Sequence, residues 1–454
     1  MNFQEKLKNT YRPVSERLRD FKEVERPLSA TEIDNQAQRC QDCGIPFCHG
    51  AGCPLCNVIP EMNAAVAAGK WRSAWDILSS TNQFPEFTSR ICPALCEASC
   101  TRGINGSPVM IRQLEKAVVE TAFNNGWVTP VSPRRNSGCN VAVVGSGPAG
   151  LAVADELSRC GHAVIVYEKN AAPGGLLRYG IPDFKLEKNI IDRRLDLMKQ
   201  SGIKFECATE VGQDIKIDYL RNRFDAVIIA AGAPAPRNLD IPGRELNGIH
   251  FALDFLGGQN RFNAGEISEL LINAKNKKVM IIGGGDTGSD CIGTALRQGA
   301  KATVQVEIMP QPPECRSEST PWPDWPYQLK TSSSHLEGTT RLWSSLTKSF
   351  EGADGNVKRV QLAKVEWEFS AEGKPLKFRE ALDTEQYIEA DLVLLALGFT
   401  TDKSLVEGEI PGVYICGDAA TGQSLVVKAM DHARKIAQMV DKNLSNNGEK
   451  NEIL

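Results

Sequence analysis

The 454-residue sequence contains no apolar run close to the roughly 20 residues that a membrane-spanning helix needs. Its beginning, Met1-Asn-Phe-Gln-Glu-Lys-Leu-Lys, lacks the apolar core of a signal peptide. The net charge of -4 is too small to create a field that would gather polyanions. These absences argue against a membrane protein, a secreted protein and a nucleic-acid-binding protein, and we expect a cytoplasmic location.

Histidine is scarce as well, because only five are present and they form no catalytic or metal-binding motif. His49 lies among cysteines and His432 lies in a helical C-terminal stretch. We expect structural roles for both and assign no catalytic acid or base.

Cysteine, in contrast, is concentrated in one part of the chain. Eight of the fourteen cysteines form the patterns Cys40-x2-Cys43-x4-Cys48-x4-Cys53-Pro-x-Cys56 and Cys92-Pro-x2-Cys96-x3-Cys100. In a reducing compartment such a group binds metal more often than it forms disulfides, and iron-sulfur clusters are the first expectation. The others are scattered singly and are expected to be buried small apolar residues: Cys139, Cys160, Cys207, Cys291, Cys315 and Cys416.

A zinc site is the alternative for the same region. Cys40-x2-Cys43 and Cys53-x2-Cys56 together could form a four-cysteine zinc site. It would leave the other four cysteines of the group without a role, so iron-sulfur clusters are favoured.

The pattern of apolar residues divides the chain. Residues 1–135 contain helix-forming stretches with cysteine loops between them, and the polar stretch 129–138 is typical of a linker. From residue 139 onward, short β-branched runs alternate with helical segments, as in a buried parallel sheet. The stretch 310–350, with three tryptophans and several prolines, is expected to be an excursion on the second of two α/β units.

The first glycine motif, Gly145-Ser-Gly-Pro-Ala-Gly150, directly follows the expected strand 140–144. In that position the glycines permit a tight turn, and a dinucleotide pyrophosphate meets the positive end of the next helix. Glu168 ends the next strand, where a carboxylate accepts hydrogen bonds from a ribose. The candidate residues are Gly145, Ser146, Gly147, Pro148, Ala149, Gly150 and Glu168.

A second glycine motif, Gly283-Gly-Gly-Asp-Thr-Gly288, follows the expected strand 278–282. Glu307 is the acid near the end of the next strand, and an acid there repels a 2'-phosphate, which favours NADH over NADPH. Arg316 is close enough in sequence to weaken this inference. The candidate residues are Gly283, Gly284, Gly285, Asp286, Thr287, Gly288 and Glu307.

Over nearly its whole length the chain resembles the small (beta) subunit of bacterial glutamate synthase. The matching stretches are Cys40-Gln-Asp-Cys-Gly-Ile-Pro-Phe-Cys48, Arg90-Ile-Cys-Pro-Ala-Leu-Cys-Glu-Ala-Ser-Cys100, Pro173-Gly-Gly-Leu-Leu-Arg-Tyr-Gly-Ile-Pro182 and Gly417-Asp-Ala-Ala-Thr-Gly-Gln-Ser-Leu-Val-Val-Lys428. The same module is similar to the electron-input part of dihydropyrimidine dehydrogenase and to a subunit of NADH-dependent ferredoxin:NADP oxidoreductases.

The resemblance implies an α/β fold with a helical N-terminal iron-sulfur domain and two Rossmann-like domains, the second inserted in the first. The domains would be residues 1–135 for two 4Fe-4S clusters, 136–248 and 391–454 for FAD, and 249–390 for NAD(P)H. Further FAD-binding residues implied by it are Gly174, Gly175, Leu176, Ala231, Gly232, Gly398, Gly417, Asp418, Gln423 and Ser424.

The resemblance also implies a division of the cluster ligands, since a cysteine before proline often binds a different cluster from its neighbours. One cluster would be held by Cys40, Cys43, Cys48 and Cys100, and the other by Cys53, Cys92, Cys96 and Glu115. Glu115 supplies an oxygen where a fourth cysteine is missing, and a surface glutamate is the alternative. Cys56 departs from the family pattern; it could replace Glu115, but a spare thiol is favoured.

The function implied is electron input. NAD(P)H would reduce FAD, and the clusters would pass electrons to FMN in a separate large (alpha) subunit that forms glutamate from glutamine and 2-oxoglutarate. The chain has no amidotransferase nucleophile motif of its own. The alternatives are a diaphorase subunit that serves a ferredoxin or another reductase, and a non-enzymatic cluster protein with a vestigial flavin site.

Overall fold

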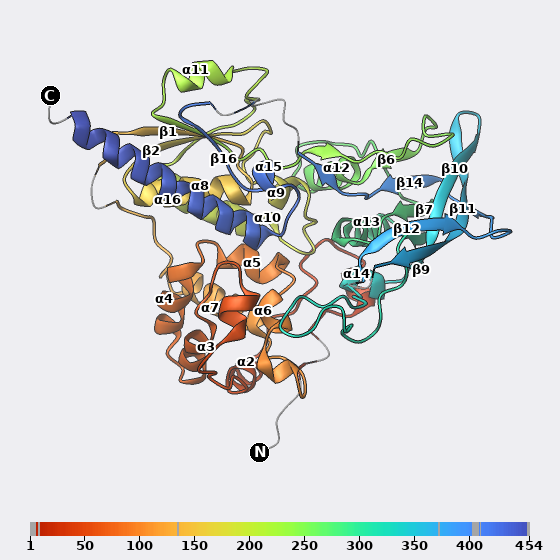
Figure 1. The fold of residues 1–454 in the computed structure, drawn as a ribbon, viewed down its shortest axis with the longest axis horizontal. Helices are drawn as coiled ribbons and strands as arrows, with labels where there is room; N and C mark the ends of the chain where they lie inside the picture. Colours follow the sequence, from red (N-terminus) through yellow and green to blue (C-terminus); the bar gives the residue numbers. More distant parts are fainter. Residues whose placement is uncertain are drawn as a thin grey trace.

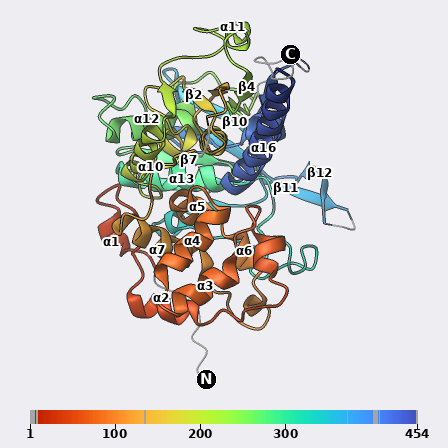
Figure 2. The same ribbon diagram turned by 90° about the vertical axis from the view of Figure 1, so that its left-hand side faces the viewer.

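The computed structural model describes residues 6–7, 10–133, 136–370, 373–401, 408 and 410–451. Its N-terminal part is helical, as predicted, and lies on one side of the two nucleotide-type units (Figures 1 and 2). The expected linker includes residues 134 and 135, which lie outside the described residues. The helices are α1 (Val14–Arg17), α2 (Ala30–Ala37), α3 (Ile59–Ala67), α4 (Trp71–Thr81), α5 (Pro85–Ile91), α6 (Leu95–Ala98) and α7 (Ile111–Asn124).

Helix α7 shows how the sequence builds this domain. Its apolar residues recur at helical spacing and are buried, with Leu114, Val118 and Val119 all fully covered. The same buried side carries an acid, Glu115, which is only 5% exposed. A helix that buries a carboxylate among apolar neighbours needs a specific partner for it.

The first α/β unit is a parallel five-stranded sheet in the order β16-β4-β1-β2-β3. The late strand expected to return and complete this unit does so, because β16 pairs with β4. Helices α8 (Pro148–Arg159) and α16 (Val426–Asn451) pack against each other beside the sheet (Figure 1). The strands are β1 (Asn140–Val144), β2 (Ala163–Tyr167), β3 (Lys204–Glu206), β4 (Ala226–Ile229) and β16 (Val413–Ile415).

Three shorter or flanking helices complete this unit. They are α9 (Leu176–Tyr179), α10 (Lys188–Gln200) and α11 (Ile217–Arg221). A fourth short helix, α15 (Asp418–Thr421), precedes α16. The chain passes between the two α/β units twice, and at the passage β5 (Ala235–Pro236) pairs antiparallel with β15 (Phe399–Thr400). The second unit is therefore inserted in the first, as predicted.

The second unit is also a parallel five-stranded sheet, in the order β6-β14-β7-β8-β9. Strand β14 (Leu392–Leu395) belongs to this sheet, so the expected domain boundary between residues 390 and 391 falls before a strand of the inserted unit and is too early. The other elements are β6 (Ile249–Phe251), α12 (Ala252–Asn263), β7 (Lys278–Ile282), α13 (Asp286–Arg297), β8 (Ala302–Val306), α14 (Ser333–Leu336) and β9 (Thr340–Leu342).

An antiparallel arm extends from the second unit and projects from the body of the molecule (Figures 1 and 2). Residues 310–332 of the expected excursion contain no helix or strand, after which α14 and β9 return the chain to the edge of the second sheet. The arm consists of β10 (Ser345–Ala353), β11 (Asn356–Phe369), β12 (Pro375–Glu380) and β13 (Gln386–Glu389).

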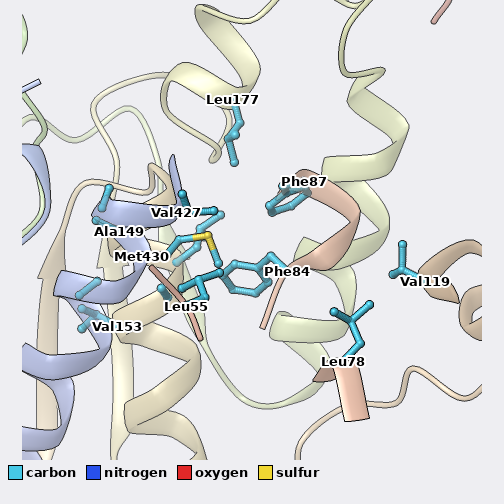
Figure 3. Packing of buried hydrophobic residues seen from close by; sticks show 14 of the residues in the cluster. Leu55, Leu78, Phe84, Phe87, Val119, Ala149, Val153, Leu177, Val427 and Met430 are labelled. Carbon is cyan, nitrogen blue, oxygen red and sulfur yellow. The ribbon is translucent and has the colours of Figure 1, made fainter. Parts of the chain in front are cut away.

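One continuous hydrophobic core joins the helical domain to the first α/β unit (Figure 3). Phe84 and Phe87 at the start of α5 are fully buried, and they face Val427 and Met430 of α16. Burying aromatic side chains of this size contributes a few kcal/mol each, so separating the two domains is costly. The helical domain is thereby held in a fixed position beside the first unit.

A buried ion-pair network joins the helical domain to the second unit. Arg17 Nε lies 2.7 Å from Glu337 Oε1, and Arg297 Nη1 lies 2.6 Å from Glu337 Oε2, with all three side chains at most 2% exposed. Such a network is costly to break, because a partner left alone would be a buried charge.

Among the described residues, no helix combines the length and the apolar character needed to cross a membrane.

Candidate functional site

The first glycine turn connects β1 to α8. Gly145 has a φ of +100°, and a Cβ on it would lie 2.6 Å from the carbonyl oxygen of Ala230, so only glycine fits. A Cβ on Gly147 would meet no atom within 4 Å, which leaves that face of the turn open. The first turn of α8 has no side-chain cap, so its N–H groups can meet an anion.

Glu168 is tied to this turn. Its Oε2 accepts hydrogen bonds from the Ser146 backbone N–H (3.2 Å) and Oγ (2.5 Å), and its Oε1 accepts from the Asn170 backbone N–H (2.9 Å). The carboxylate therefore fixes the turn against the end of β2. Hydrogen bonding to a ribose stays a prediction.

The other candidate FAD residues converge on the same turn. A Cβ on Gly175 would lie 2.6 Å from Gly147 Cα, and a Cβ on Gly417 would lie 2.5 Å from Ala149 Cβ. These close approaches bring the stretches around residues 147, 175 and 417 together without side chains between them. The geometry is a backbone cradle of the kind that a dinucleotide needs.

The carboxylate of Asp418 is oriented by Ser424, whose Oγ donates to Oδ1 at 2.5 Å. Burial raises the pKa of Asp418 above its usual range, and the hydrogen bonds from Ser424 oppose that rise. His432, expected to be structural, accepts the Gly417 N–H at 3.0 Å with its Nδ1, and so supports the same motif.

Two of the remaining candidates, Gln423 and Gly398, lie at the passage between the two units. Gln423 Oε1 accepts the Phe399 N–H at 3.1 Å, next to Gly398, where a Cβ would approach the same oxygen to 2.9 Å. Ala231 and Gly232 follow β4 beside the first turn, and Leu176 begins α9 with 49% of its surface exposed.

The second glycine turn repeats this geometry between β7 and α13. A Cβ on Gly283 would lie 2.3 Å from the Ala396 carbonyl oxygen, whereas a Cβ on Gly285 would meet nothing within 4 Å. Glu307 Oε2 accepts the Gly284 N–H at 2.6 Å. The rest of the motif, Asp286, Thr287 and Gly288, lies at the start of α13 as predicted.

Arg316 does not lie against Glu307. Its guanidinium donates to the carbonyl oxygens of Thr320 (3.1 Å), Asp324 (2.5 Å) and Ala98 (2.9 Å). These bonds direct Arg316 toward the helical domain. Its position in the sequence therefore no longer weakens the inference that Glu307 favours NADH.

A hydrogen-bonded relay supports the second turn, and the sequence motifs did not reveal it. The Ser332 N–H donates to His335 Nδ1 at 3.0 Å, so Nε2 is the protonated nitrogen and donates to Gln305 Oε1 at 2.9 Å. Gln305 Nε2 in turn donates to the Gly283 carbonyl at 2.9 Å. The neutral ring thus fixes the orientation of the Gln305 amide.

The relay predicts an acid-sensitive turn. Burial, followed by the charges of Arg341 and Lys185 and opposed by Asp286, lowers the pKa of His335 from 6.5 to about 4. Between these values the unfolded chain binds more protons, so the free energy of unfolding rises with pH and falls on acidification from 6.5 toward 4. We expect His335→Gln to reduce the difference between the thermal midpoints at pH 7 and pH 5. An unchanged difference would show that the relay does not control acid stability.

The first group of predicted cluster ligands lies around one small hollow. Cys40, Cys43, Cys48 and Cys100 all line it. Burial, and then the charges of Cys100, Cys40 and Cys43, raise the pKa of Cys48 to about 12. Four cysteines around one hollow fit a cationic iron centre, which stabilises thiolates.

The second group lies at the hydrophobic core, in which Cys53 and Cys96 are buried and against which Cys92 packs. Burial, and then the charge of Glu115, raise the pKa of Cys96, and Cys53 and Cys92 contribute further. Burial also raises the pKa of Glu115 to about 7, and its Oε1 accepts a hydrogen bond from Asn57 Nδ2 at 2.7 Å. A buried carboxyl beside three cysteines fits an oxygen ligand, and the alternative of a surface glutamate is wrong.

The zinc alternative gains no support. Cys40 and Cys43 line their hollow together with Cys48 and Cys100, whereas Cys53 and Cys56, the other two cysteines of the zinc alternative, do not line it. Cys56 is exposed, and its Sγ lies 3.9 Å from the Pro54 carbonyl oxygen. Its exposure fits the expected spare thiol.

Comparisons with known proteins find family models for both parts of the chain. Residues 17–127 match the family model of dihydropyrimidine dehydrogenase domain II, 4Fe-4S cluster, and residues 139–322 match that of pyridine nucleotide-disulphide oxidoreductases. The chain is 49% identical to the glutamate synthase [NADPH] small chain of Mycobacterium tuberculosis H37Rv, over 95% of this chain and 93% of that one.

Two further relatives place the chain in a wider context. It is 40% identical to the Bacillus subtilis glutamate synthase [NADPH] small chain, over 94% of each. It is also 40% identical to glutamate synthase [NADH] of Saccharomyces cerevisiae, over 95% of this chain and 22% of that protein.

Among solved structures, Mycobacterium tuberculosis FprA in complex with NADPH aligns with a TM-score of 0.57 at 20% identity, over 70% of this chain and 87% of that one. At this identity the likeness shows the fold of the two α/β units.

Proposed function

Because this chain belongs to the family of glutamate synthase small chains, we propose that it is the electron-input subunit of a glutamate synthase. In this role it takes electrons from NAD(P)H for a large subunit that forms glutamate from glutamine and 2-oxoglutarate. The observation that carries the proposal is the 49% identity over 95% of this chain and 93% of a small chain. Two open glycine turns and two cysteine groups supply the sites that this role requires.

We propose that FAD binds at the first turn. Gly147 leaves room for the pyrophosphate, and Asp418, oriented by Ser424, directly follows Gly417 of the same cradle. When bound, FAD accepts a hydride from NAD(P)H, and 4Fe-4S clusters carry electrons onward singly. A hydride transfer of this kind needs positioning and exclusion of water rather than a proton donor, so we assign no catalytic side chain.

We propose NADH as the preferred reductant at the second turn. The carboxylate of Glu307 points at Gly284, where it can accept a ribose hydroxyl and repel a 2'-phosphate. Arg316, the cation whose sequence position opposed this inference, is bound to three carbonyl oxygens elsewhere.

We propose two 4Fe-4S clusters in the helical domain. Cys40, Cys43, Cys48 and Cys100 hold one, and Cys53, Cys92, Cys96 and Glu115 hold the other. Among the described residues no cysteine is paired in a disulfide, which supports a reducing, cytoplasmic compartment.

We propose a hetero-oligomer with an FMN-bearing large subunit. The Saccharomyces cerevisiae relative supports this partnership, because the stretch matching this chain makes up 22% of one polypeptide. A module joined covalently to a much larger chain in one organism is expected to bind its counterpart in another.

The test is turnover by the chain co-purified with its large subunit. We expect NADH oxidation that depends on both glutamine and 2-oxoglutarate and yields glutamate. NADH bleaching of the flavin with no response to these two substrates would contradict the proposal and would identify a diaphorase serving another acceptor.

A further inference from the structure

The irregular segment before α14 lies across the second nucleotide site. Ser332 Oγ lies 2.6 Å from Ser289 Oγ in the first turn of α13, so the chain crosses this helix at its N-terminal end. Arg341 Nη1 donates to the Lys330 carbonyl at 3.1 Å, which fixes the backbone two residues earlier. The His335 relay to Gly283 ties the same segment to the glycine turn.

Lys330 is the cation that this arrangement presents. Its Nζ lies 3.5 Å from the centre of the Trp325 ring, which serves as a platform for the ammonium. Among the described residues it forms no ion pair. Ser332, two residues later, contacts Ser289 in the first turn of α13, which places the segment that carries Lys330 at the start of this helix. Burial lowers the pKa of Lys330, and the charge of Asp286 opposes that shift.

The two glycine turns differ in charge at the first position of the helix that follows. The first turn has an uncharged residue, Pro148, at the first position of its helix, whereas the second has Asp286. An acid there suits the helix dipole but repels an incoming pyrophosphate. The second site therefore needs a compensating positive charge that the first does not.

We propose that Lys330 binds the pyrophosphate of the pyridine nucleotide and offsets the charge of Asp286. This inference rests on the proposed function of the second turn. The 2'-position is assigned to Glu307, whose carboxylate accepts the Gly284 N–H, and not to Lys330. Lys330 consequently serves NADH and NADPH alike.

The test compares Lys330→Gln, Lys330→Arg and, as a matched control, Lys301→Gln, an exposed lysine of the same unit. Calorimetry measures binding of ADP-ribose to the full chain, which needs no turnover. We expect Lys330→Gln to weaken binding about tenfold or more, because a hydrogen bond to a charged group is lost. Lys330→Arg should restore most of the affinity, and Lys301→Gln should leave it unchanged.

Steady-state reduction of the flavin supplies a second readout. The KM for NADH and for NADPH should rise by the same factor in Lys330→Gln, with little change in kcat. Unchanged ADP-ribose affinity, or a loss confined to NADPH, would overturn the proposal. Failure of the wild-type chain to oxidise either nucleotide would instead contradict the proposed function, while ADP-ribose binding would still test Lys330.

Discussion

Replacing Cys92 by alanine is expected to lower the iron content from about eight to about four atoms per chain, because one of the two proposed 4Fe-4S clusters is lost. Cys43→Ala should have the same effect on the other cluster. The two variants should lose different EPR signals, since their thiols lie in separate groups. In the complex with the large subunit, both should reduce glutamate formation to background.

Cys56→Ala is the matched control, since Cys56 is an exposed cysteine of the same region. It should retain the full iron content and both EPR signals. Flavin bleaching by NADH should persist in all three variants, because that step involves the α/β units. Iron loss in Cys56→Ala, or loss of both clusters in Cys92→Ala, would contradict the ligand assignment.

Glu115 allows a finer test of the second group. Glu115→Ala should alter only the EPR signal that Cys92→Ala removes, because its carboxyl is buried beside the same cysteines. Changing an oxygen ligand also changes the charge around the cluster and hence its potential. An effect on the signal lost in Cys43→Ala would place Glu115 in the wrong group.

The glycine turns show what could be predicted from the sequence. A glycine motif between a β-branched run and a helix marks backbone geometry that only a few residues satisfy, so the strand bounds of β1 and β7 were predicted correctly. The boundary at residue 391 was wrong because an apolar strand such as β14 suits either sheet equally well. Pairing of strands distant in sequence, here β14 with β6 and β7, decides it.

The supporting contacts of the sites could not be predicted. Asn57, Gln305 and His335 belong to no motif, and each acts through a partner distant in sequence. Glu168 and Glu307 are different, because their spacing from the turns made them candidates from the sequence. That each accepts a backbone N–H of its own turn is visible only in three dimensions.

Contacts of the helical domain with both α/β units have a functional consequence. The buried core around Phe84 and Phe87 holds it to the first unit, and the Arg17–Glu337 pair holds it to the second. An electron path needs fixed separations between its carriers. These contacts fix all three parts relative to one another.

Replacing Glu307 by glutamine is expected to shift the ratio of kcat/KM for NADPH to that for NADH about tenfold or more toward NADPH. Removing the negative charge abolishes its repulsion of the 2'-phosphate, and tenfold corresponds to about 1.4 kcal/mol. The amide oxygen of glutamine can still accept the Gly284 N–H, so the turn should keep its shape. Anaerobic stopped-flow reduction of the flavin with each nucleotide measures the ratio.

The control is Glu314→Gln, an exposed position seven residues after Glu307, and it should leave the ratio unchanged. The Glu307→Gln variant separates two roles of the Glu307 carboxylate, holding the turn and repelling a 2'-phosphate. An equal loss for both nucleotides would show that Glu307 only holds the turn, because a disturbed pyrophosphate site does not distinguish NADH from NADPH. A selective gain with NADPH would show that its charge faces the 2'-position. Because Lys330→Gln should affect both nucleotides equally, the two variants together locate the two ends of the bound nucleotide on the site.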